Sequence, residues 1–285
     1  YFRYICVQNR SMYTEYQPSH LLVPYIDSYW EFKGNPDYGM RIHILPDGCT
    51  DFIFTLGEVA NAVEEGSLMM QPYRSYFVGP MTKYSELVTY TESIHMFGVR
   101  FLPCGLSCFT NLPLHEFVNS RVSTNEMKAV FDDTFIEKLG EQKHVTDRIR
   151  VVEEYLLAYL ARHYQPADSH VAMAVNMINH SEGKRSVRSL MDDVCLCQRH
   201  FERKFKHYTG FTPKEYSRIV KFKNAVELLR TTTSANLLTT AVDAGYYDLA
   251  HFSKEIKSMS GNTPASFLSL TVPEETTLTY IEPQR

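Results

Sequence analysis

The chain has 285 residues, 44% of them hydrophobic, and a formal net charge of −4. This length suits one large domain or two ordinary domains with substantial hydrophobic cores. No signal peptide and no run of about 18 apolar residues is present, which argues against a secreted or membrane-spanning protein. We therefore expect a cytoplasmic protein without a membrane partner.

The amino-terminal part is predicted to be a β domain. Short β-prone runs alternate with turns such as Pro46-Asp47-Gly48, and they lie at Tyr29–Phe32, Arg41–Leu45, Asp51–Leu56, Tyr76–Val78, Glu86–Tyr90 and His95–Phe101. Strands at this spacing predict a sheet sandwich or a small barrel. Residues 1–11 show no clear pattern, so we expect the domain to begin near Met12.

Five residues of this domain are candidates for an effector pocket: Trp30, His43, Asp51, Phe54 and Arg100. Strand alternation should point Arg100 away from its neighbours Val99 and Phe101, into the barrel. There it either pairs with Asp51 as a structural ion pair or binds a ligand. Core packing explains the aromatic residues equally well.

No metal, cofactor or catalytic residue is predicted. His43 and His95 are isolated, and no His-x-His pair of the kind used by metal-binding cupins occurs. The six cysteines lack the C-x-x-C spacing of a zinc site.

The pattern becomes helical after the strands. Ser123 to Glu126 resembles a capping box and predicts a helix over Met127–Asp132. A longer helix is predicted over Asp147–His163, with an apolar stripe that we expect to pack within the chain rather than on a second subunit. The domain boundaries that follow are 1–165 and 166–270, with a tail at 271–285 whose role is not assigned.

An internal repeat lies between Gln198 and Phe267. The residues His200, Phe201, Lys206, Gly210, Thr212 and Pro213 recur 51 positions later (200 to 251, 213 to 264) as His251, Phe252, Lys257, Gly261, Thr263 and Pro264. Each copy predicts two short helices, Val187–Val194 with Gln198–Tyr208 and Thr239–Ala244 with Leu249–Met259. Ser186 and Asp248 are the predicted caps, and Gly210 and Gly261 are the predicted ends.

Helix, short turn, helix is the helix-turn-helix plan, whose second helix enters the DNA major groove. We place the first motif at 186–209, a connecting helix at 213–230 and the second motif at 239–260. To reach successive major grooves, the two motifs would lie about 34 Å apart.

This part of the chain resembles the DNA-binding domain of the AraC/XylS family of bacterial transcription regulators. Three segments carry the resemblance: Arg199-His200-Phe201-Glu202-Arg203-Lys204-Phe205-Lys206, Thr209-Gly210-Phe211-Thr212-Pro213-Lys214-Glu215-Tyr216, and Ala241 to Lys254 with Ala244-Gly245-Tyr246-Tyr247-Asp248 at its centre. Ile256 departs from the phenylalanine usual in the family, and Val194 stands where a turn glycine is expected.

Two amino-terminal segments also resemble the amino-terminal domain of one AraC-type subgroup. They are Leu45-Pro46-Asp47-Gly48-Cys49-Thr50-Asp51-Phe52 and Gly98 to Pro103. The resemblance implies a small cupin-like barrel. In the wider family such domains sense small molecules or mediate dimerisation.

Positive charge is concentrated in the first motif and the connecting helix. From Lys184 to Lys223 there are eleven Lys and Arg against four Asp and Glu, whereas Thr231 to Leu270 has two against three. DNA affinity comes mainly from cations that neutralise phosphates. We therefore expect the first motif and connecting helix to supply most of the affinity, unless these charges form an ordinary solvated face.

The resemblance implies base contacts at Arg199, Glu202 and Arg203 on the first recognition helix, with Phe201 and Phe205 buried behind them. Arg suits guanine and Glu can accept from cytosine, although Glu202 could instead orient a neighbouring Arg. The second helix offers Leu249, Ala250 and Lys254, of which the first two give only apolar contact. Predicted phosphate contacts are Lys204, Lys206, Ser253 and Lys257.

The sequence thus predicts an α+β protein of two domains that acts as a sequence-specific DNA-binding transcription regulator. Double-stranded DNA is the expected partner, and a small-molecule effector, RNA polymerase and a second copy of the chain are further candidates. Two alternatives stay open: an enzyme whose catalytic barrel is tethered to DNA, and a protein-interaction adaptor that has lost DNA reading.

Overall fold

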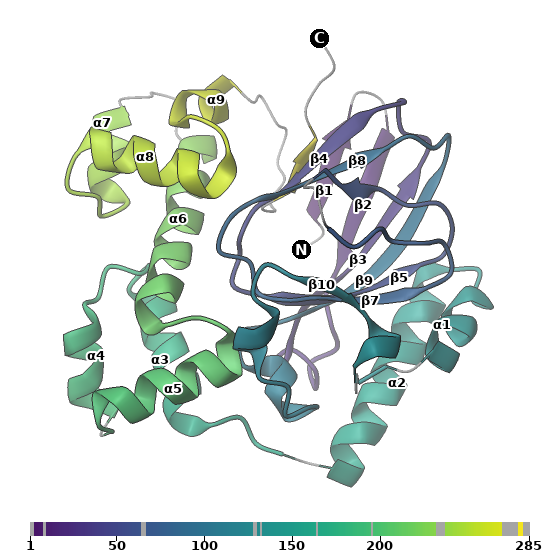
Figure 1. Cartoon of the computed structure of the whole chain (residues 1–285), viewed down its shortest axis with the longest axis horizontal. Coiled ribbons are helices and arrows are strands. Elements are labelled where there is room, and N and C mark those ends of the chain that lie inside the picture. The colour runs from purple at the N-terminus through teal and green to yellow at the C-terminus, as the bar shows by residue number, and fades with distance from the viewer. Residues whose placement is uncertain are drawn as a thin grey trace.

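The computed structural model describes residues 3–7, 10–63, 67–127, 130–131, 133–163, 165–194, 196–231, 237–269 and 279–281. It has an amino-terminal part of antiparallel sheets with covering helices and an all-helical part packed beside it (Figure 1). The predicted α+β class with two domains is confirmed. The strands form two sheets rather than one closed barrel.

The larger sheet has the strand order β1-β2-β3-β9-β5-β7-β10 and the smaller has β11-β4-β8-β6. Strands of the larger sheet are β1 (Arg3–Val7), β2 (Arg10–Tyr16), β3 (Ile26–Gly34), β5 (Thr50–Thr55), β7 (Ser75–Val78), β9 (Ile94–Phe101) and β10 (Arg121–Ser123). Those of the smaller are β4 (Met40–Ile44), β6 (Asn61–Ala62), β8 (Ser85–Thr89) and β11 (Thr279–Ile281). Each of the six predicted strands is present.

Alternation along β5 shows how the larger sheet supports two cores. Phe52 and Phe54 are fully buried against the covering helices, where Phe54 contacts Phe131 and Phe135 at ring-centroid distances of 5.3 and 5.7 Å. Ile53, which points the other way, lies in the second core between the two sheets. One face of the sheet is therefore closed by helices and the other by the smaller sheet.

Short helices surround the sheets: η1 (Gly105–Cys108), η2 (Leu114–Phe117), η3 (Thr124–Glu126), α1 (Asp133–Gly140) and α2 (Val145–His163). The helix predicted over Met127–Asp132 is wrong in its position. The chain forms the 3-10 turn η3 before it and a helix after it, and residues 128, 129 and 132 lie outside the described residues. Val152 and Leu156 of α2 are buried in the core beneath the larger sheet, so its predicted packing within the chain is confirmed.

The sequence suggested that the domain begins near Met12, but it begins earlier. β1 pairs antiparallel with β2 from Arg3 opposite Glu15 to Val7 opposite Arg10. These strands extend the edge of the larger sheet. At the other end of the chain, β11 pairs antiparallel with β4 in the smaller sheet, so part of the unassigned tail has a structural place.

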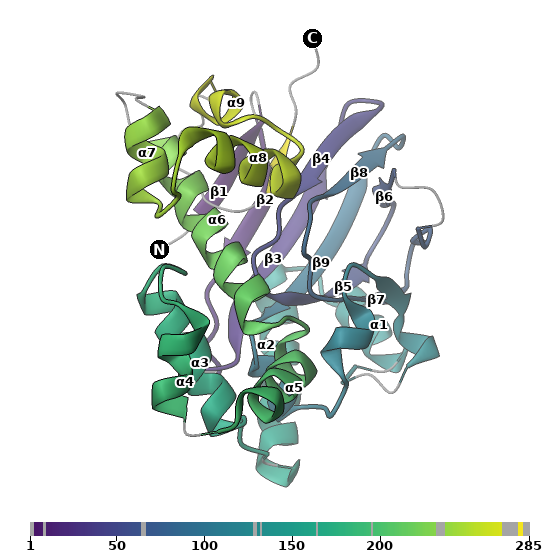
Figure 2. The same ribbon diagram turned by 60° about the vertical axis from the view of Figure 1, so that its left-hand side comes forward.

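The helical part consists of α3 (Ser169–His180), α4 (Val187–Val194), α5 (Gln198–Thr209), α6 (Pro213–Thr231), α7 (Leu237–Asp243), α8 (Leu249–Ser260) and α9 (Pro264–Ser269). α6 runs between the α3–α5 group and the α7–α9 group (Figure 2). Its start is fixed by a capping box, because Thr212 N–H donates to Glu215 at 2.7 Å and Glu215 N–H donates to the Thr212 hydroxyl at 3.1 Å. Within the described residues, no helix is long and apolar enough to cross a membrane.

The two parts share a hydrophobic core. Leu45 and Cys104 of the sheet part belong to the same buried cluster as Tyr216 of α6. Gly48, in the Pro46-Asp47-Gly48 turn, adopts a φ of 88°, and a Cβ added there would lie 2.8 Å from the ring of Tyr216. Beside it, Lys223 Nζ donates to the Asp47 carbonyl at 3.4 Å. This turn is therefore a direct contact between the sheets and α6.

Asp168 fixes the start of the helical part. Its carboxylate accepts from the N–H groups of His170 and Val171 at 3.1 and 3.2 Å and from Lys204 Nζ at 2.6 Å, so it both caps α3 and joins it to α5. Burial alone would raise the pKa of Asp168, but the hydrogen bonds from Lys204 and Val171 hold it below its ordinary value. The ionised carboxylate thus stabilises the fold.

Replacing Gly48 with Ala should destabilise the protein by about 1–3 kcal/mol, because the new methyl group meets a buried ring and the backbone conformation disfavours a side chain. Gly140→Ala is the matched control, since no atom lies within 4 Å of a Cβ built there. Chemical denaturation measures both variants. Equal stability for the two would contradict the close contact.

Replacing Asp168 with Ala should lower the free energy of unfolding by about 0.5–2 kcal/mol at neutral pH through the lost cap and ion pair. A carboxyl group whose pKa is lowered on folding stabilises the folded protein at pH values above its unfolded-state pKa. This contribution to the free energy of unfolding is lost as the pH falls through the folded-state pKa. The difference between variant and wild type should therefore shrink in acid. Denaturation curves at neutral and strongly acidic pH test this, with Asp192→Ala, exposed on α4, as control.

Candidate nucleic-acid interface and regulatory cavity

The first motif is held by a buried aromatic pair. Phe201 and Phe205, one turn apart on α5, are fully buried with ring centroids 5.6 Å apart, and Phe205 also contacts Tyr216 of α6 at 5.9 Å. Ser186 caps α4 by accepting from Ser189 N–H at 3.1 Å, as predicted. Because the inward positions of α5 are fixed, its other face is presented to solvent.

That outer face contains the predicted reading residues. Arg199, Arg203 and Lys206 are exposed, and Glu202 is half-buried. Arg203 donates to His200 Nδ1 at 3.1 Å, which steadies its guanidinium. Among the described residues, no hydrogen bond or ion pair engages the side chains of Arg199 and Lys206. These cations are available to an external anion.

Two predicted contacts are already engaged within the protein. Glu202 accepts from Gln198 Nε2 at 2.9 Å rather than from either neighbouring Arg, so it does not orient them in this structure. Lys204 is bound to Asp168, as described above. Of the two, only Glu202 lies among the outward residues at the start of the helix.

The second motif has the same scaffold and a different surface. Phe252 and Ile256 are buried, Asp248 caps α8 by accepting from His251 N–H at 2.7 Å, and Gly261 ends it with a φ of 76°. The predicted positions Leu249, Ala250, Lys254 and Lys257 are exposed and Ser253 is half-exposed. Large apolar side chains are unusually exposed nearby: Val242 at 58% and Tyr247 at 92%.

The cations of the connecting helix are mostly committed to contacts inside the protein. Arg218 forms a two-pronged ion pair with Glu255 of α8, at 2.8 and 3.1 Å. Lys221 lies 5.6 Å from the ring centre of Tyr246 and donates to the Gly245 carbonyl. The expectation that α6 supplies charge for DNA stays a prediction. In this structure the side chains of Arg218 and Lys221 join α6 to the second motif.

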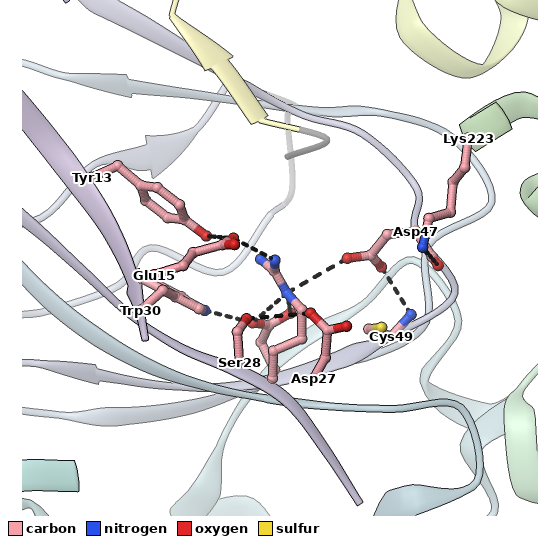
Figure 3. Close-up of polar contacts among 10 residues, drawn as sticks. Tyr13, Glu15, Asp27, Ser28, Trp30, Asp47, Cys49 and Lys223 are labelled. Atoms are coloured by element: carbon pink, nitrogen blue, oxygen red, sulfur yellow. Dashed lines mark hydrogen bonds and ion pairs between the residues drawn. The ribbon is translucent and has the colours of Figure 1, made fainter. Parts of the chain in front are cut away.

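Arg100 is buried and forms ion pairs with three carboxylates. Figure 3 shows this charged cluster, with Glu15, Trp30 and Asp47 labelled. Its guanidinium is 3.2 Å from Glu15, 3.3 Å from Asp51 and 3.5 Å from Asp47, and Trp30 Nε1 donates to Asp51 at 2.7 Å. Burial opposes the charge, but these carboxylates, Asp51 foremost, raise the pKa of Arg100 above its ordinary value. Arg100 is therefore paired within the chain, and its predicted ion pair with Asp51 is present.

A cavity between the sheets adjoins this cluster. It is lined by Trp30, Asp51, Arg100 and Arg121 together with apolar side chains from both sheets. Trp30, Asp51 and Arg100 were predicted. The predicted Phe54 does not line this cavity, since it faces α1 on the opposite side of the sheet. His43 does not line the cavity either: it points from β4 towards Tyr84, with ring centroids 6.2 Å apart.

Arg121 was missed by sequence reasoning. It lies on β10, a strand of three residues opposite Val78 of β7, too short for alternation to reveal its direction. Within the described residues, no group of three or more His, Cys, Asp or Glu side chains is placed to hold a metal ion.

Two sequence families match this chain. The first, described as a helix-turn-helix domain, matches residues 190–269, which cover most of both motifs and α6. The second, a domain of unknown function designated DUF6597, matches residues 14–123, which contain most of the strands. No curated protein matches the sequence significantly.

Several solved structures are similar. ToxT from Vibrio cholerae has a TM-score of 0.50 at 9% identity, over 85% of this chain and 98% of that chain. ToxT with an unsaturated fatty acid bound gives 0.48 at 11% identity, over 86% and 96%. A probable AraC family transcriptional regulator from Rhodopseudomonas palustris gives 0.34 at 20% identity, over 37% of this chain and 100% of that chain.

At 9% identity the likeness to ToxT shows a shared fold, and it extends over both parts of the chain. The helix-turn-helix family covers the repeated motifs whose outward faces are described above. Residues 190–269 are therefore an AraC-type helix-turn-helix domain, and the chain is a DNA-binding transcription regulator with the two-domain fold of ToxT.

Proposed function

We propose that this regulator binds duplex DNA chiefly through α5, with Arg199 and Arg203 reading base edges and Lys206 contacting a phosphate. The observation that supports this best is that all three are exposed on the helix face opposite the buried Phe201–Phe205 pair. Arg can donate two hydrogen bonds to guanine O6 and N7. Lys206, further along the helix, is placed to position the protein without specifying sequence.

The second motif contributes less affinity in this proposal. Leu249 and Ala250 offer apolar contact to a thymine methyl group, and Lys254 adds one exposed cation. Arg218, which might have assisted from α6, is held by Glu255. Discrimination between DNA sequences should therefore be strongest at the half of the site that α5 contacts.

Control by the amino-terminal domain follows from its contacts with the helical part. The Asp47–Gly48 turn joins the Arg100 cluster on one side to Tyr216 and Lys223 of α6 on the other. A small molecule that binds between the sheets would shift the population of domain arrangements only if it binds one arrangement better. We infer that the sheets form the effector domain of the regulator.

A contact with another protein is a second candidate role for the second motif. Val242 and Tyr247 expose large apolar surfaces beside α8. RNA polymerase or a second copy of the chain would fit such a surface. An adaptor that no longer reads DNA would use this surface and would not need Arg199 or Arg203.

The target DNA can be identified by footprinting upstream of the protein's own gene and its neighbours, or by selection from random duplexes with the full-length chain. Recovery of one defined sequence supports the proposal. Recovery of none, with protein that is folded, would favour the adaptor.

On the selected duplex, Arg199→Ala and Arg203→Ala should each lose about 1–3 kcal/mol of binding free energy and relax specificity at one position. Lys206→Ala should weaken binding to all sequences alike. It should also reduce the slope of log K against the logarithm of the salt concentration by about one, because one phosphate contact is lost. Fluorescence anisotropy over a range of salt concentrations measures both effects. Arg150→Ala, an exposed arginine on α2, serves as control, and unchanged binding in the Arg199 and Arg203 variants would exclude reading by α5.

A further inference from the structure

A second cavity opens beside Arg121, next to the one between the sheets. It has a volume of about 410 Å³, within the range of roughly 300–1,000 Å³ typical of ligand sites. The charged residues in its described lining are Lys83 and Arg121, and the hydroxyl and amide groups of Ser85, Asn119 and Ser120 lie beside them. This cavity therefore has a positive and hydrogen-bonding character.

The inner cavity between the sheets is apolar and narrow. Its volume is about 60 Å³, and Phe32, Ile42, Leu87 and Met96 line it together with Trp30. Val78, Met81 and Arg121 belong to both linings, so the two cavities meet at these residues. An occupant of both would have an apolar end towards Trp30 and a polar end beside Arg121.

Arg121 differs from Arg100 because no carboxylate among the described residues forms an ion pair with it. Its Nε is buried and has no hydrogen-bond partner in that part of the chain. Asp51, the acidic residue of the inner cavity, is already engaged by Arg100 and Trp30. Burial lowers the pKa of Arg121 although Asp51 acts in the opposite direction. A buried guanidinium nitrogen without a hydrogen-bond partner is costly, and an anion that accepts from it offsets that cost.

We propose that the two cavities form one site for a small organic carboxylate with an apolar body. The carboxylate is held by the planar guanidinium of Arg121, which matches it in a two-pronged geometry. The apolar body extends towards Trp30 between the sheets. This inference deepens the proposed function, on which it rests, by naming the chemical class of the effector.

The loop between β7 and β8, residues 79–84, joins this site to both recognition helices. On one side, Met81, Lys83 and Tyr84 line the cavities. On the other, the loop contacts the glycines that end α5 and α8. A Cβ at Gly210 would lie 2.5 Å from Pro80, and one at Gly261 would lie 2.7 Å from the Tyr84 ring.

Arg121 and this loop are bonded together. Asn119 N–H donates to the Pro80 carbonyl, and the Asn119 side chain exchanges hydrogen bonds with Thr82, each at 2.8 Å. Gly79 N–H donates to the Ser120 carbonyl at 3.0 Å. A shift of Arg121 towards a bound carboxylate would therefore move the loop, and the loop would move the ends of α5 and α8. Ligand binding should change how the two helices are presented to DNA.

Trp30 gives a direct measurement, because it is the single tryptophan of the chain and lines the inner cavity. The full-length protein is titrated with octanoate and phenylacetate, with the corresponding primary amides, and with inorganic phosphate, and its fluorescence is followed. The carboxylates should bind at least about tenfold more tightly than the amides, because a charged hydrogen bond contributes about 1.5–3 kcal/mol. Phosphate alone should leave the fluorescence unchanged.

Arg121→Gln should weaken carboxylate binding about tenfold or more, and Arg121→Lys should restore part of it. Arg74→Gln, exposed just before β7, is the matched control and should bind like wild type. Thermal unfolding confirms that each variant is folded, and the partial rescue by Lys separates lost charge from lost structure. The site is overturned if no carboxylate binds, if amides bind equally, if phosphate alone accounts for binding, or if Arg121→Gln has no effect.

Coupling is tested with Pro80→Ala, which removes the loop's contact with the end of α5 without changing the cavity lining. Ligand affinity should stay within about twofold of wild type, while the effect of ligand on DNA affinity is reduced. Pro72→Ala, outside the loop, should keep the full effect. An unchanged effect in Pro80→Ala would overturn the coupling role. Failure of the proposed function can be distinguished from failure of the ligand site. In the first case the protein does not bind DNA even without ligand, while the fluorescence titration still shows carboxylate binding.

Discussion

The packing of both recognition helices on α6 is the constraint on which the rest of the structure depends. Phe205 and Tyr216 join α5 to α6, and Arg218 with Glu255 joins α8 to it. A close-packed core transmits strain, so a displacement of α6 is passed on to both motifs. Because Tyr216 also packs over Gly48, the same helix that sets the geometry of the reading surface is in contact with the sheets.

Two arginines between the sheets show how the surroundings of a buried charge define its role. Arg100 is surrounded by Glu15, Asp47 and Asp51, and removing one of these partners would leave charge uncompensated in a medium of low polarity. Arg121 lies at the rim of the same space, and no carboxylate of the described part of the chain forms an ion pair with it. The first arrangement joins β2, β5 and β9 of the larger sheet, whereas the second leaves a cation available at the rim of the cavity.

Features that depend on neighbours in sequence could be predicted, and those that depend on distant partners could not. The caps Ser186 and Asp248 and the ends at Gly210 and Gly261 follow from local backbone chemistry, and all are present. The direction of Arg100 followed from alternation. The same alternation, counted from Asp51, puts Phe54 on the opposite face.

Other features have no local signal. The partners of Lys204 and Arg218 lie 36 and 37 residues away, and only the tertiary fold shows that these cations are engaged. The pairing of β11 with β4 joins segments more than 200 positions apart, between stretches with no shared pattern. The direction of Arg121 depends on its register against β7, which a strand of three residues does not reveal.

The return of the tail to β4 has a topological consequence. The chain leaves the sheet part after α2 and rejoins it at β11, so the helix-turn-helix domain is an insertion within the amino-terminal fold rather than an appendage. A domain joined to the sheets at both ends moves less freely than one joined by a single linker. Its effective concentration near the sheets is therefore higher than that of a domain with one linker. If the contact opens, its reclosure is an intramolecular step.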